Sequence, residues 1–150
     1  MKKYYQILFT LLFLATLNSA FANPNDKQVI TTTDAPKAVG PYSQAIQVGN
    51  ALYLSGQIAI HPKTGEMNHG TIEQQTKQVL ENIKAVLNAS GYQLSDVVQS
   101  QVFLTDLKNY QSMNAIYAQY FVEKPPARAA VEVSRLPLDA VVEIMVTAVK

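Results

Sequence analysis

The stretch from Thr71 to Gly91 carries apolar side chains at helical spacing, and it constrains the fold more than any other part of the sequence. Thr71 and Gln74 have the spacing of a capping box, in which each side chain accepts a hydrogen bond from the other residue's backbone N–H. Gly91 is the residue type that commonly follows the end of a helix. The stretch therefore predicts an amphipathic helix that needs an apolar surface to pack against. Its apolar face consists of Ile72, Val79, Leu80, Ile83, Val86 and Leu87.

Segments with strand-like composition lie on both sides of this helix, and a second amphipathic segment lies between two of them. That segment begins near a possible cap at Asp106 and is expected to end at Pro125-Pro126, because proline cannot continue a helix. Its apolar face consists of Tyr110, Met113, Ile116, Tyr117, Tyr120 and Phe121. Gly49-Asn50 separates two of the strand-like runs and predicts a hairpin. The predicted strands are Val29–Thr31, Ser43–Val48, Ala51–Leu54, Gln57–Ile60, Val97–Leu104, Ala129–Val133 and Val141–Val149.

The elements follow the order strands, helix, strand, helix, strands, in a chain of 150 residues that has room for one domain. Two helices packed on one face of a mixed sheet is the simplest arrangement, so the predicted fold class is α+β. The other face of the sheet would expose apolar side chains. We therefore expect an oligomer that covers this face.

The N-terminal residues have the three parts of a secretory signal peptide. Lys2 and Lys3 give a positive head, residues 7–17 form an apolar run, and Ala20-Phe21-Ala22 has the small-x-small form of a cleavage site. The run is about half of the roughly 20 residues that span a membrane, so an uncleaved anchor is the weaker alternative. We expect a signal peptide over residues 1–22, a mature domain over residues 23–150, and a periplasmic or secreted protein without a membrane attachment.

The composition excludes several classes of function. Without Lys2 and Lys3 the chain has 10 basic and 11 acidic side chains, a net charge of −1, and it has no Lys/Arg cluster, so we expect no nucleic-acid partner. The absence of cysteine excludes disulfides, thiolate chemistry and a lipoprotein anchor. His61 and His69 are the only histidines, and their place in a turn region favours surface residues over a metal site or a catalytic triad. No glycine-rich phosphate-binding motif is present.

Two charged residues lie at or within apolar strands, where an unpaired charge is costly. Arg128 lies at the start of a strand, directly after Pro125-Pro126-Ala127, and Glu143 lies inside the run Val141–Val146. A salt bridge between Arg128 and Glu143, or solvent exposure on an edge strand, explains both without a function. The other interpretation is a site in which the planar fork of the Arg128 guanidinium binds a carboxylate.

Two short segments carry polar groups that have either a functional role or an ordinary structural role. Ser55-Gly56-Gln57 places a hydroxyl and a flexible backbone amide between two strands, and a β-bulge has the same pattern. Gly40-Pro41-Tyr42-Ser43 is a turn with an aromatic hydroxyl, which is also typical of a packed loop tyrosine.

Several ordered segments resemble the signature of the RidA/YjgF family over most of the chain, roughly residues 29–150. Their number and order make the resemblance specific, whereas a single Pro-Ala-Arg triplet is not. The segments are Gly40–Ala45, Leu54–Ile58, Glu73–Thr76 with Asn82-Ile83, Val102–Asp106, Pro126–Val133 and Leu136-Pro137.

The resemblance implies a fold like that of bacillus chorismate mutase and a homotrimer with active sites in the clefts between subunits. It implies the hydrolysis of reactive imines and enamines to 2-keto acids and ammonia, with 2-iminobutanoate and 2-iminopropanoate (or its enamine, 2-aminoacrylate) as substrates. It also implies that no metal or organic cofactor takes part.

The resemblance assigns roles to particular residues as well. Arg128 matches the arginine that binds the substrate carboxylate, and Glu143 matches the acidic residue that orients or activates the attacking water. The further positions that match are Tyr42 and Ser55 in the catalytic group, and Gly56, Asn114 and Ala130 in the substrate-binding group.

Two features depart from the family's pattern. Ala130 occupies a position that is frequently cysteine in the family; alanine excludes thiol chemistry there but keeps the backbone carbonyl through which the position largely acts. The signal sequence is the second departure, because most relatives act in the cytosol or in organelles. It motivates an alternative function, a non-enzymatic binding module for small carboxylates or for a partner protein. Ribonuclease activity, attributed to some relatives, is disfavoured by the near-neutral charge.

Overall fold

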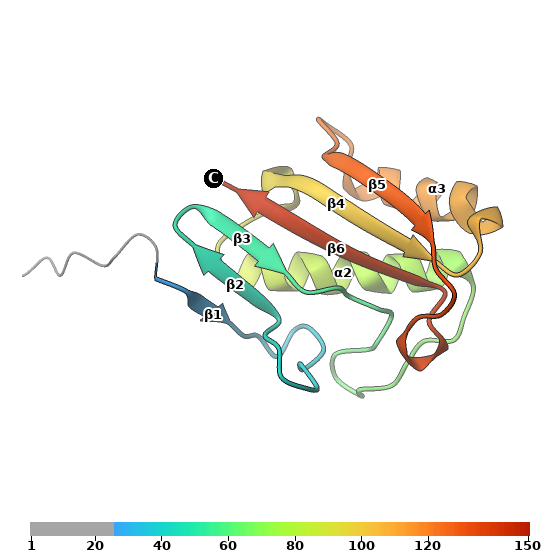
Figure 1. The fold of residues 1–150 in the computed structure, drawn as a ribbon, viewed down its shortest axis with the longest axis horizontal. Helices are drawn as coiled ribbons and strands as arrows, with labels where there is room; N and C mark the ends of the chain where they lie inside the picture. The colour runs from blue at the N-terminus through green and yellow to red at the C-terminus, as the bar shows by residue number, and fades with distance from the viewer. Residues whose placement is uncertain (1–25) are drawn as a thin grey trace, which may run out of the picture.

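The computed structural model describes residues 26–150, and the predicted signal peptide with its cleavage site lies outside the described residues. Figure 1 shows one sheet with two α-helices behind it, which confirms the predicted α+β class and the placement of both helices on one face of a mixed sheet. The main elements in chain order are β1 (Gln28–Ile30), β2 (Ala45–Val48), β3 (Ala51–Leu54), α2 (Ile72–Ala89), β4 (Val97–Leu104), α3 (Tyr110–Tyr120), β5 (Ala127–Glu132) and β6 (Val142–Val149).

The six strands are arranged in the order β1-β2-β3-β6-β4-β5. The predicted hairpin is present, since β2 and β3 pair from Ala45 opposite Leu54 to Val48 opposite Ala51. β4 and β5 are parallel and all other neighbours are antiparallel. A parallel pair needs a crossover connection, and α3 supplies it. The C-terminal strand β6 therefore joins the N-terminal hairpin to the β4–β5 pair in the middle of the sheet.

Helix α2 begins as the sequence predicted. The Gln74 Oε1 accepts a hydrogen bond from the Thr71 backbone N–H at 2.9 Å, and the Thr71 hydroxyl accepts one from the Gln74 N–H at 3.4 Å. The predicted apolar face of α2 packs against the sheet, with every member buried except the partly buried Ile72. Each such side chain contributes about 1.5–3 kcal/mol when fully buried, so this face is a main source of stability.

The side chains of β6 show how the two faces of the sheet differ. Val142, Ile144 and Val146 are buried under the helices, whereas Glu143 and the alternate residues after it point to the opposite face. We call this opposite face the open face. Tyr53 of β3 and Val131 of β5 are 52% and 46% exposed, and the strand alternation places both on the open face. No helix of residues 26–150 is both long enough and apolar enough to cross a membrane.

The segment Gln57–Ile60, predicted as a strand, forms only isolated bridges at its two ends, so this prediction is wrong. After Gln57 the backbone turns, and the Ile60 N–H donates to the Ile58 carbonyl. The carbonyls of Ile58 and Ile60 accept hydrogen bonds from the buried Asn82 side chain of α2 at 3.2 and 2.9 Å. A side chain thus satisfies polar groups that a neighbouring strand would otherwise satisfy.

The second helix is also shorter than predicted. Asp106 caps a separate 3-10 turn, Leu107–Asn109, rather than α3 itself. The helix ends before Phe121, whose ring stacks on Tyr117 at a centroid distance of 4.5 Å. The helix therefore ends before Pro125-Pro126, and the buried Phe121 side chain packs into the core directly after its last residue.

Replacing Asn82 by alanine is expected to destabilise the fold by about 2 kcal/mol, because the two carbonyls lose their buried donor. Urea denaturation followed by circular dichroism measures this change. Asn88→Ala is the matched control, since Asn88 is an exposed asparagine on the same helix. Equal midpoints for the two variants would contradict the role given to Asn82.

Candidate functional site

Arg128 lies on the helix-covered side of the sheet, where two tyrosines of α3 hold it. Strand β5 begins at Ala127, two residues earlier than predicted, because its parallel pairing with β4 extends that far, so Arg128 lies within the strand. Its register partner on β4 is the fully buried Ser100. The Arg128 Nη2 donates a hydrogen bond to the Tyr110 hydroxyl at 3.1 Å. The guanidinium carbon lies 4.5 Å from the centroid of the Tyr117 ring, which is a cation–π contact.

Asn114 and Ala130 belong to the same group as Arg128. The Asn114 side chain, one helical turn after Tyr110, is the main cause that lowers the pKa of the Tyr110 hydroxyl, and Arg128 acts in the same direction. Ala130 packs against the core on the same side of β5. The structure therefore brings three of the predicted site residues together between β5 and α3. We call them, with Tyr110, the arginine group.

Burial raises the pKa of the Tyr117 hydroxyl in this group. The Ser100 hydroxyl approaches closely enough to oppose that shift, but the two hydroxyls do not meet the geometry of a hydrogen bond. Neither has another partner among residues 26–150. A buried hydroxyl without a partner is costly, so Tyr117 is positioned by its ring contacts rather than by its hydroxyl.

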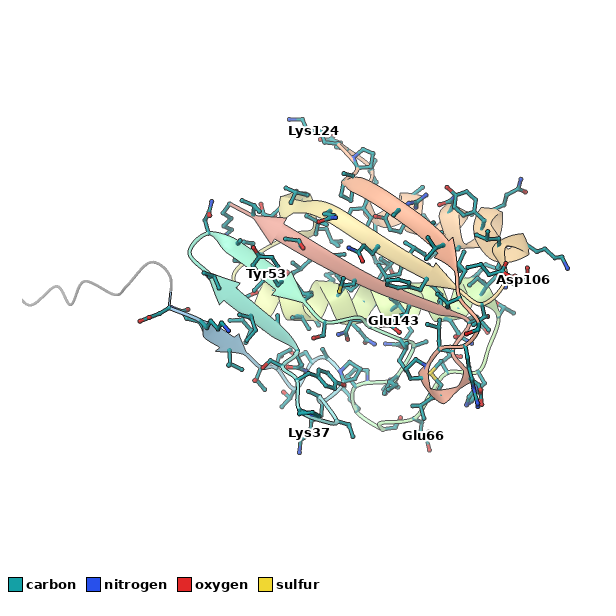
Figure 2. All side chains as sticks on the ribbon, in the orientation of Figure 1. Lys37, Tyr53, Glu66, Asp106, Lys124 and Glu143 are labelled. Atoms are coloured by element: carbon teal, nitrogen blue, oxygen red, sulfur yellow. The ribbon has the colours of Figure 1, made fainter. Side chains whose placement is uncertain are left out.

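Glu143 lies near the start of β6, on the open face (Figure 2). The backbone of Gly56 passes directly against it: a Cβ at position 56 would lie 2.8 Å from the Glu143 Cδ and 3.1 Å from its Cγ. Only glycine permits this approach. Gln57 and Ile144 fix the segment by exchanging backbone hydrogen bonds of 2.9 and 3.1 Å. Burial raises the pKa of the Glu143 carboxyl, which suits a group that takes up a proton during a reaction.

Ser55 and Tyr42 lie in the segments that adjoin Gly56. The Ser55 hydroxyl donates to the Ser43 carbonyl at 2.7 Å, which ties the end of β3 to the loop before β2. The Tyr42 hydroxyl accepts a hydrogen bond from the Val39 N–H at 3.2 Å, and its ring lines a hollow of about 450 Å³. The second collection of predicted site residues, which we call the glutamate group, is Ser55, Gly56 and Glu143. Tyr42 is connected to this group only through its neighbour Ser43, and its own contacts lie in the loop before β2.

The two groups lie on opposite faces of the sheet. Arg128 shares the face of the buried Ser100, whereas Glu143 alternates with buried neighbours and faces away from the helices. The salt bridge considered from the sequence is therefore absent. Within residues 26–150 the only ion pair joins Arg135 and Asp139. Within one copy of the chain the arginine group and the glutamate group do not face each other.

The sequence analysis did not identify Tyr110 and Tyr117 as partners of Arg128. Both lie at helical spacing with Met113, and this pattern predicted that they belong to the core. Tyr117 does lie in the core, but Tyr110 is 38% exposed and turns its hydroxyl to the arginine. The apolar pattern does not distinguish a buried tyrosine from one that binds a charged side chain.

No group of three or more histidine, aspartate or glutamate side chains is arranged to hold a metal ion in the part of the chain that the structure describes. His61 and His69 are both exposed, as predicted. The His61 Nδ1 accepts hydrogen bonds from the Lys63 and Thr64 N–H groups at 3.3 and 3.4 Å, so this histidine organises a turn.

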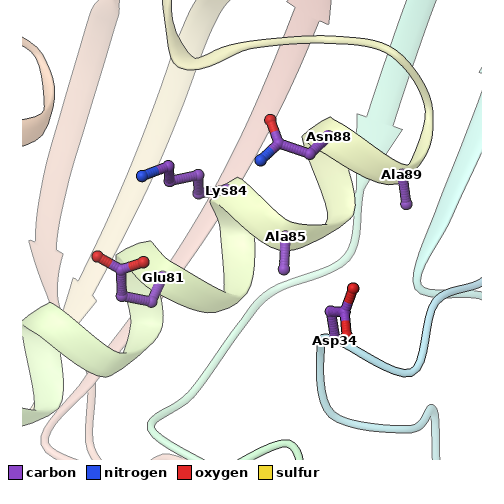
Figure 3. Close-up of a pocket in the computed structure, with 6 residues that line it drawn as sticks. All are labelled: Asp34, Glu81, Lys84, Ala85, Asn88 and Ala89. Carbon is purple, nitrogen blue, oxygen red and sulfur yellow. The ribbon is translucent and has the colours of Figure 1, made fainter.

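A separate hollow of about 390 Å³ lies on the outer side of α2 (Figure 3). Glu81, Lys84 and Asn88 line it together with Asp34 from the loop after β1. All four are exposed and none belongs to the arginine or glutamate group. This hollow therefore contributes nothing to the candidate site.

The fold and the two groups define a class of protein: a small α+β domain with an arginine held by two tyrosines on one face of the sheet and a partly buried carboxylate on the other. The family model described as Endoribonuclease L-PSP matches residues 32–150. The chain belongs to this family, the RidA/YjgF family whose signature the sequence resembles.

Three relatives illustrate the match. A RutC family protein of Pyrococcus horikoshii is 57% identical over 83% of this chain and 98% of its own. The chloroplastic Reactive Intermediate Deaminase A of Arabidopsis thaliana is 44% identical over 84% of this chain and 67% of its own. The crystal structure of E. coli TdcF with bound serine superposes with a TM-score of 0.79, at 38% identity over 82% of this chain and 98% of that one. The family thus includes reactive intermediate deaminases.

Proposed function

We propose that the protein is a hydrolytic deaminase of reactive 2-imino acids and their enamine tautomers, with 2-iminobutanoate and 2-iminopropanoate (2-aminoacrylate) as substrates. The observation that carries the proposal is the Glu143 carboxyl, desolvated against Gly56 and without a cationic partner among the described residues. The Arabidopsis relative, named a reactive intermediate deaminase, supports the same reaction class.

In the proposed reaction Arg128 binds the substrate carboxylate through its planar fork. Glu143 takes a proton from water as the hydroxide adds to the carbon of the protonated imine, and the resulting carbinolamine carries both an OH and an NH₂ group. Glu143 then gives that proton to the nitrogen and takes the hydroxyl proton as the C–N bond breaks, so a 2-keto acid and ammonia leave. The imine carbon is already electrophilic. The protein's task is therefore to hold the substrate carboxylate and to place a water about 3–3.5 Å from the imine carbon.

We further propose that the working form is a homotrimer in which the arginine group of one subunit meets the glutamate group of its neighbour. The two groups lie on opposite faces of one chain, so an inter-subunit cleft is the simple way to unite them. The exposed apolar side chains of the open face supply a surface for the association. Light scattering is expected to give a trimer mass, and a monomer would contradict the shared site.

The test of the reaction is direct. An amino-acid oxidase or dehydratase generates 2-iminobutanoate in situ, and the purified protein is expected to accelerate the appearance of 2-ketobutyrate and ammonia. Rates equal to those in buffer would refute the proposal.

Mixing two inactive variants tests the shared site. Arg128→Ala and Glu143→Gln are dissociated, mixed in equal amounts and reassembled. If neighbouring subunits supply the two residues, random assembly leaves about a quarter of the sites intact, and activity returns to about that fraction. Mixtures that stay inactive would place both residues in one subunit's site.

Gly56→Ala is expected to lower kcat/KM about tenfold to a hundredfold, because the new methyl group displaces the Glu143 carboxylate. The displaced atoms are the far end of a flexible side chain, so the fold should tolerate the change. The denaturation midpoint is therefore expected to shift less than in Asn82→Ala. Full activity in Gly56→Ala would show that the close contact does not matter for the reaction.

A binding module for small carboxylates is the second candidate, and the serine bound to E. coli TdcF favours it. Calorimetric binding of 2-ketobutyrate without any turnover would support this function over the deaminase. RNA cleavage that persists through purification and disappears in Arg128→Ala would instead support a ribonuclease, against the near-neutral charge of the chain.

The N-terminal signal-like segment supports export of the protein from the cytoplasm. We propose that cleavage after Ala22 releases a domain of residues 23–150 into the periplasm or the medium. Mass spectrometry of the protein recovered from its producing cell is expected to show an N-terminus at Asn23. A retained Met1 would contradict this.

A further inference from the structure

The guanidinium of Arg128 makes two different kinds of contact with α3. The guanidinium carbon lies over the Tyr117 ring, 4.5 Å from its centroid, and Nη2 donates to the Tyr110 hydroxyl at 3.1 Å. The Tyr110 ring lies further away, at 5.7 Å from the guanidinium carbon, so its hydroxyl makes the closer contact. The ring contact holds the guanidinium against α3, and the hydrogen bond from Nη2 fixes how the guanidinium is turned.

The Tyr117 ring, against which the guanidinium lies, is fixed in the core. Tyr117 is 5% exposed, and its ring stacks on Phe121 at 4.5 Å. Tyr110, by contrast, lies in the first turn of α3 with 38% of its surface exposed, so among residues 26–150 only its bond to Arg128 and its contact with Asn114 orient the hydroxyl. The Tyr110 hydroxyl is therefore the group that decides how the arginine is turned.

A guanidinium has two edges that bind a carboxylate with two parallel hydrogen bonds, one formed by Nε with Nη2 and the other by Nη1 with Nη2. Both edges use Nη2, each through a different hydrogen. Tyr110 occupies one of these two hydrogens. Arg128 consequently has one complete edge left for an incoming carboxylate.

Resting on the proposed function, we propose that Tyr110 is a positioning residue: its hydroxyl blocks one carboxylate-binding edge of Arg128 and thereby orients a single α-carboxylate for attack at the neighbouring imine carbon. The ligand class that fits is a monocarboxylate with a planar sp² carbon next to the carboxylate. Without the hydroxyl, Arg128 would bind the same carboxylate on either edge, and only one of the two poses brings the imine carbon to the water.

The test compares Tyr110→Phe with the wild type in two measurements: calorimetric binding of 2-ketobutyrate, and the separate values of kcat and KM for 2-iminobutanoate. Phenylalanine keeps the ring and deletes only the hydroxyl. Affinity for the keto acid is expected to fall no more than about fivefold, because an arginine that is free to turn must be ordered on binding. The value of kcat is expected to fall about tenfold, because the two competing poses cost about a factor of two and the looser orientation of the imine carbon slows the reaction step further. KM is expected to change little, since the second pose strengthens apparent binding while the less ordered arginine weakens it.

Tyr120→Phe is the matched control, since Tyr120 lies on the same helix and its hydroxyl bonds Glu81 at 2.6 Å instead of Arg128. This variant is expected to change the stability of the protein while leaving both kcat and the affinity for 2-ketobutyrate as in the wild type. If Tyr110→Phe loses activity only in proportion to a lower melting temperature, its role is structural and the inference is wrong.

The failure of this inference is distinguishable from the failure of the proposed function. Wild-type values of kcat and affinity in Tyr110→Phe, together with an inactive Arg128→Ala, would overturn the positioning role and leave the deaminase in place. A wild type that binds 2-ketobutyrate without turnover would overturn the deaminase, and the positioning role would then stand or fall on whether Tyr110→Phe weakens binding. A wild type that does neither would overturn both.

Discussion

Arg128→Ala is expected to lower kcat/KM for 2-iminobutanoate at least about a hundredfold. Hydrogen bonds to a charged group contribute about 1.5–3 kcal/mol each, and a bidentate pair therefore corresponds to a factor of about 10² to 10⁴ in rate. The loss should appear in keto-acid affinity as well, because the arginine binds the carboxylate that substrate and product share.

The effect on the fold is expected to be smaller. Arg128 is half-buried at an edge strand, and its removal leaves the Tyr110 hydroxyl exposed to water rather than buried without a partner. Light scattering and thermal denaturation of the variant check that the assembly persists. A variant that loses activity only because it loses its assembly would not support the assigned role.

Arg128→Lys and Arg135→Ala complete this experiment. Lysine keeps the charge but has no planar fork, so it should recover only a small part of the activity. Arg135 is an exposed arginine whose partner is Asp139, and its replacement should leave kcat/KM within about twofold, since exposed ion pairs contribute little. Full activity of Arg128→Ala would refute the carboxylate-binding role.

The helices and the hairpin were predictable because their signals are local. The capping box at Thr71 and Gln74, the turn at Gly49-Asn50 and the apolar spacing of α2 all operate over a few residues. Their hydrogen bonds form in the structure as the spacing required. Local chemistry and the global fold agree at these positions.

The prediction of a strand at Gln57–Ile60 was wrong for a reason that lies outside the segment. Its composition favours a strand, but the carbonyls of Ile58 and Ile60 accept hydrogen bonds from Asn82, which lies more than twenty positions further along the chain and on a helix. No pattern within the segment contains that information. At the early end of α3 the structure likewise shows what the proline signal does not, because Phe121 there joins the core formed by other parts of the chain.

The candidate site shows the same division. Residue types identified Arg128 and Glu143 as costly charges in apolar surroundings, and the family resemblance added their separate roles. Neither shows that one strand register directs Arg128 under α3 while another directs Glu143 to the open face. The pairing of β5 beside β4 decides this, and it requires the three-dimensional arrangement.

Glu143→Gln is expected to abolish most of the activity while making the protein more stable at neutral pH. Removing a general base costs a factor of about 10² to 10⁴. Glutamine has the same shape and keeps the contact with Gly56, so the loss would reflect the missing basic oxygen and not a disturbed pocket.

The gain in stability follows from the direction of the pKa shift. Burial raises the pKa of Glu143 above its ordinary value of 4.5, so the folded protein holds this proton more tightly than the unfolded chain does. At low pH the carboxyl is neutral in both states and carries no penalty. As the pH rises through the unfolded pKa, the unfolded chain ionises first, and the folded state loses stability until the pH exceeds the folded pKa. Glutamine cannot ionise and avoids this loss.

Two pH series therefore test one residue. The stability difference between Glu143→Gln and wild type should be small below pH 4.5, grow as the pH rises, and level off above the raised pKa. Over that same upper range wild-type kcat/KM should rise, because only the ionised carboxyl accepts a proton from water, and the rise should be missing from the variant's residual activity. A stability difference independent of pH would mean that Glu143 is not desolvated, and a shared pH profile would mean that another group is the base. If both expectations hold, the carboxylate that costs the fold stability is the same one that the reaction requires.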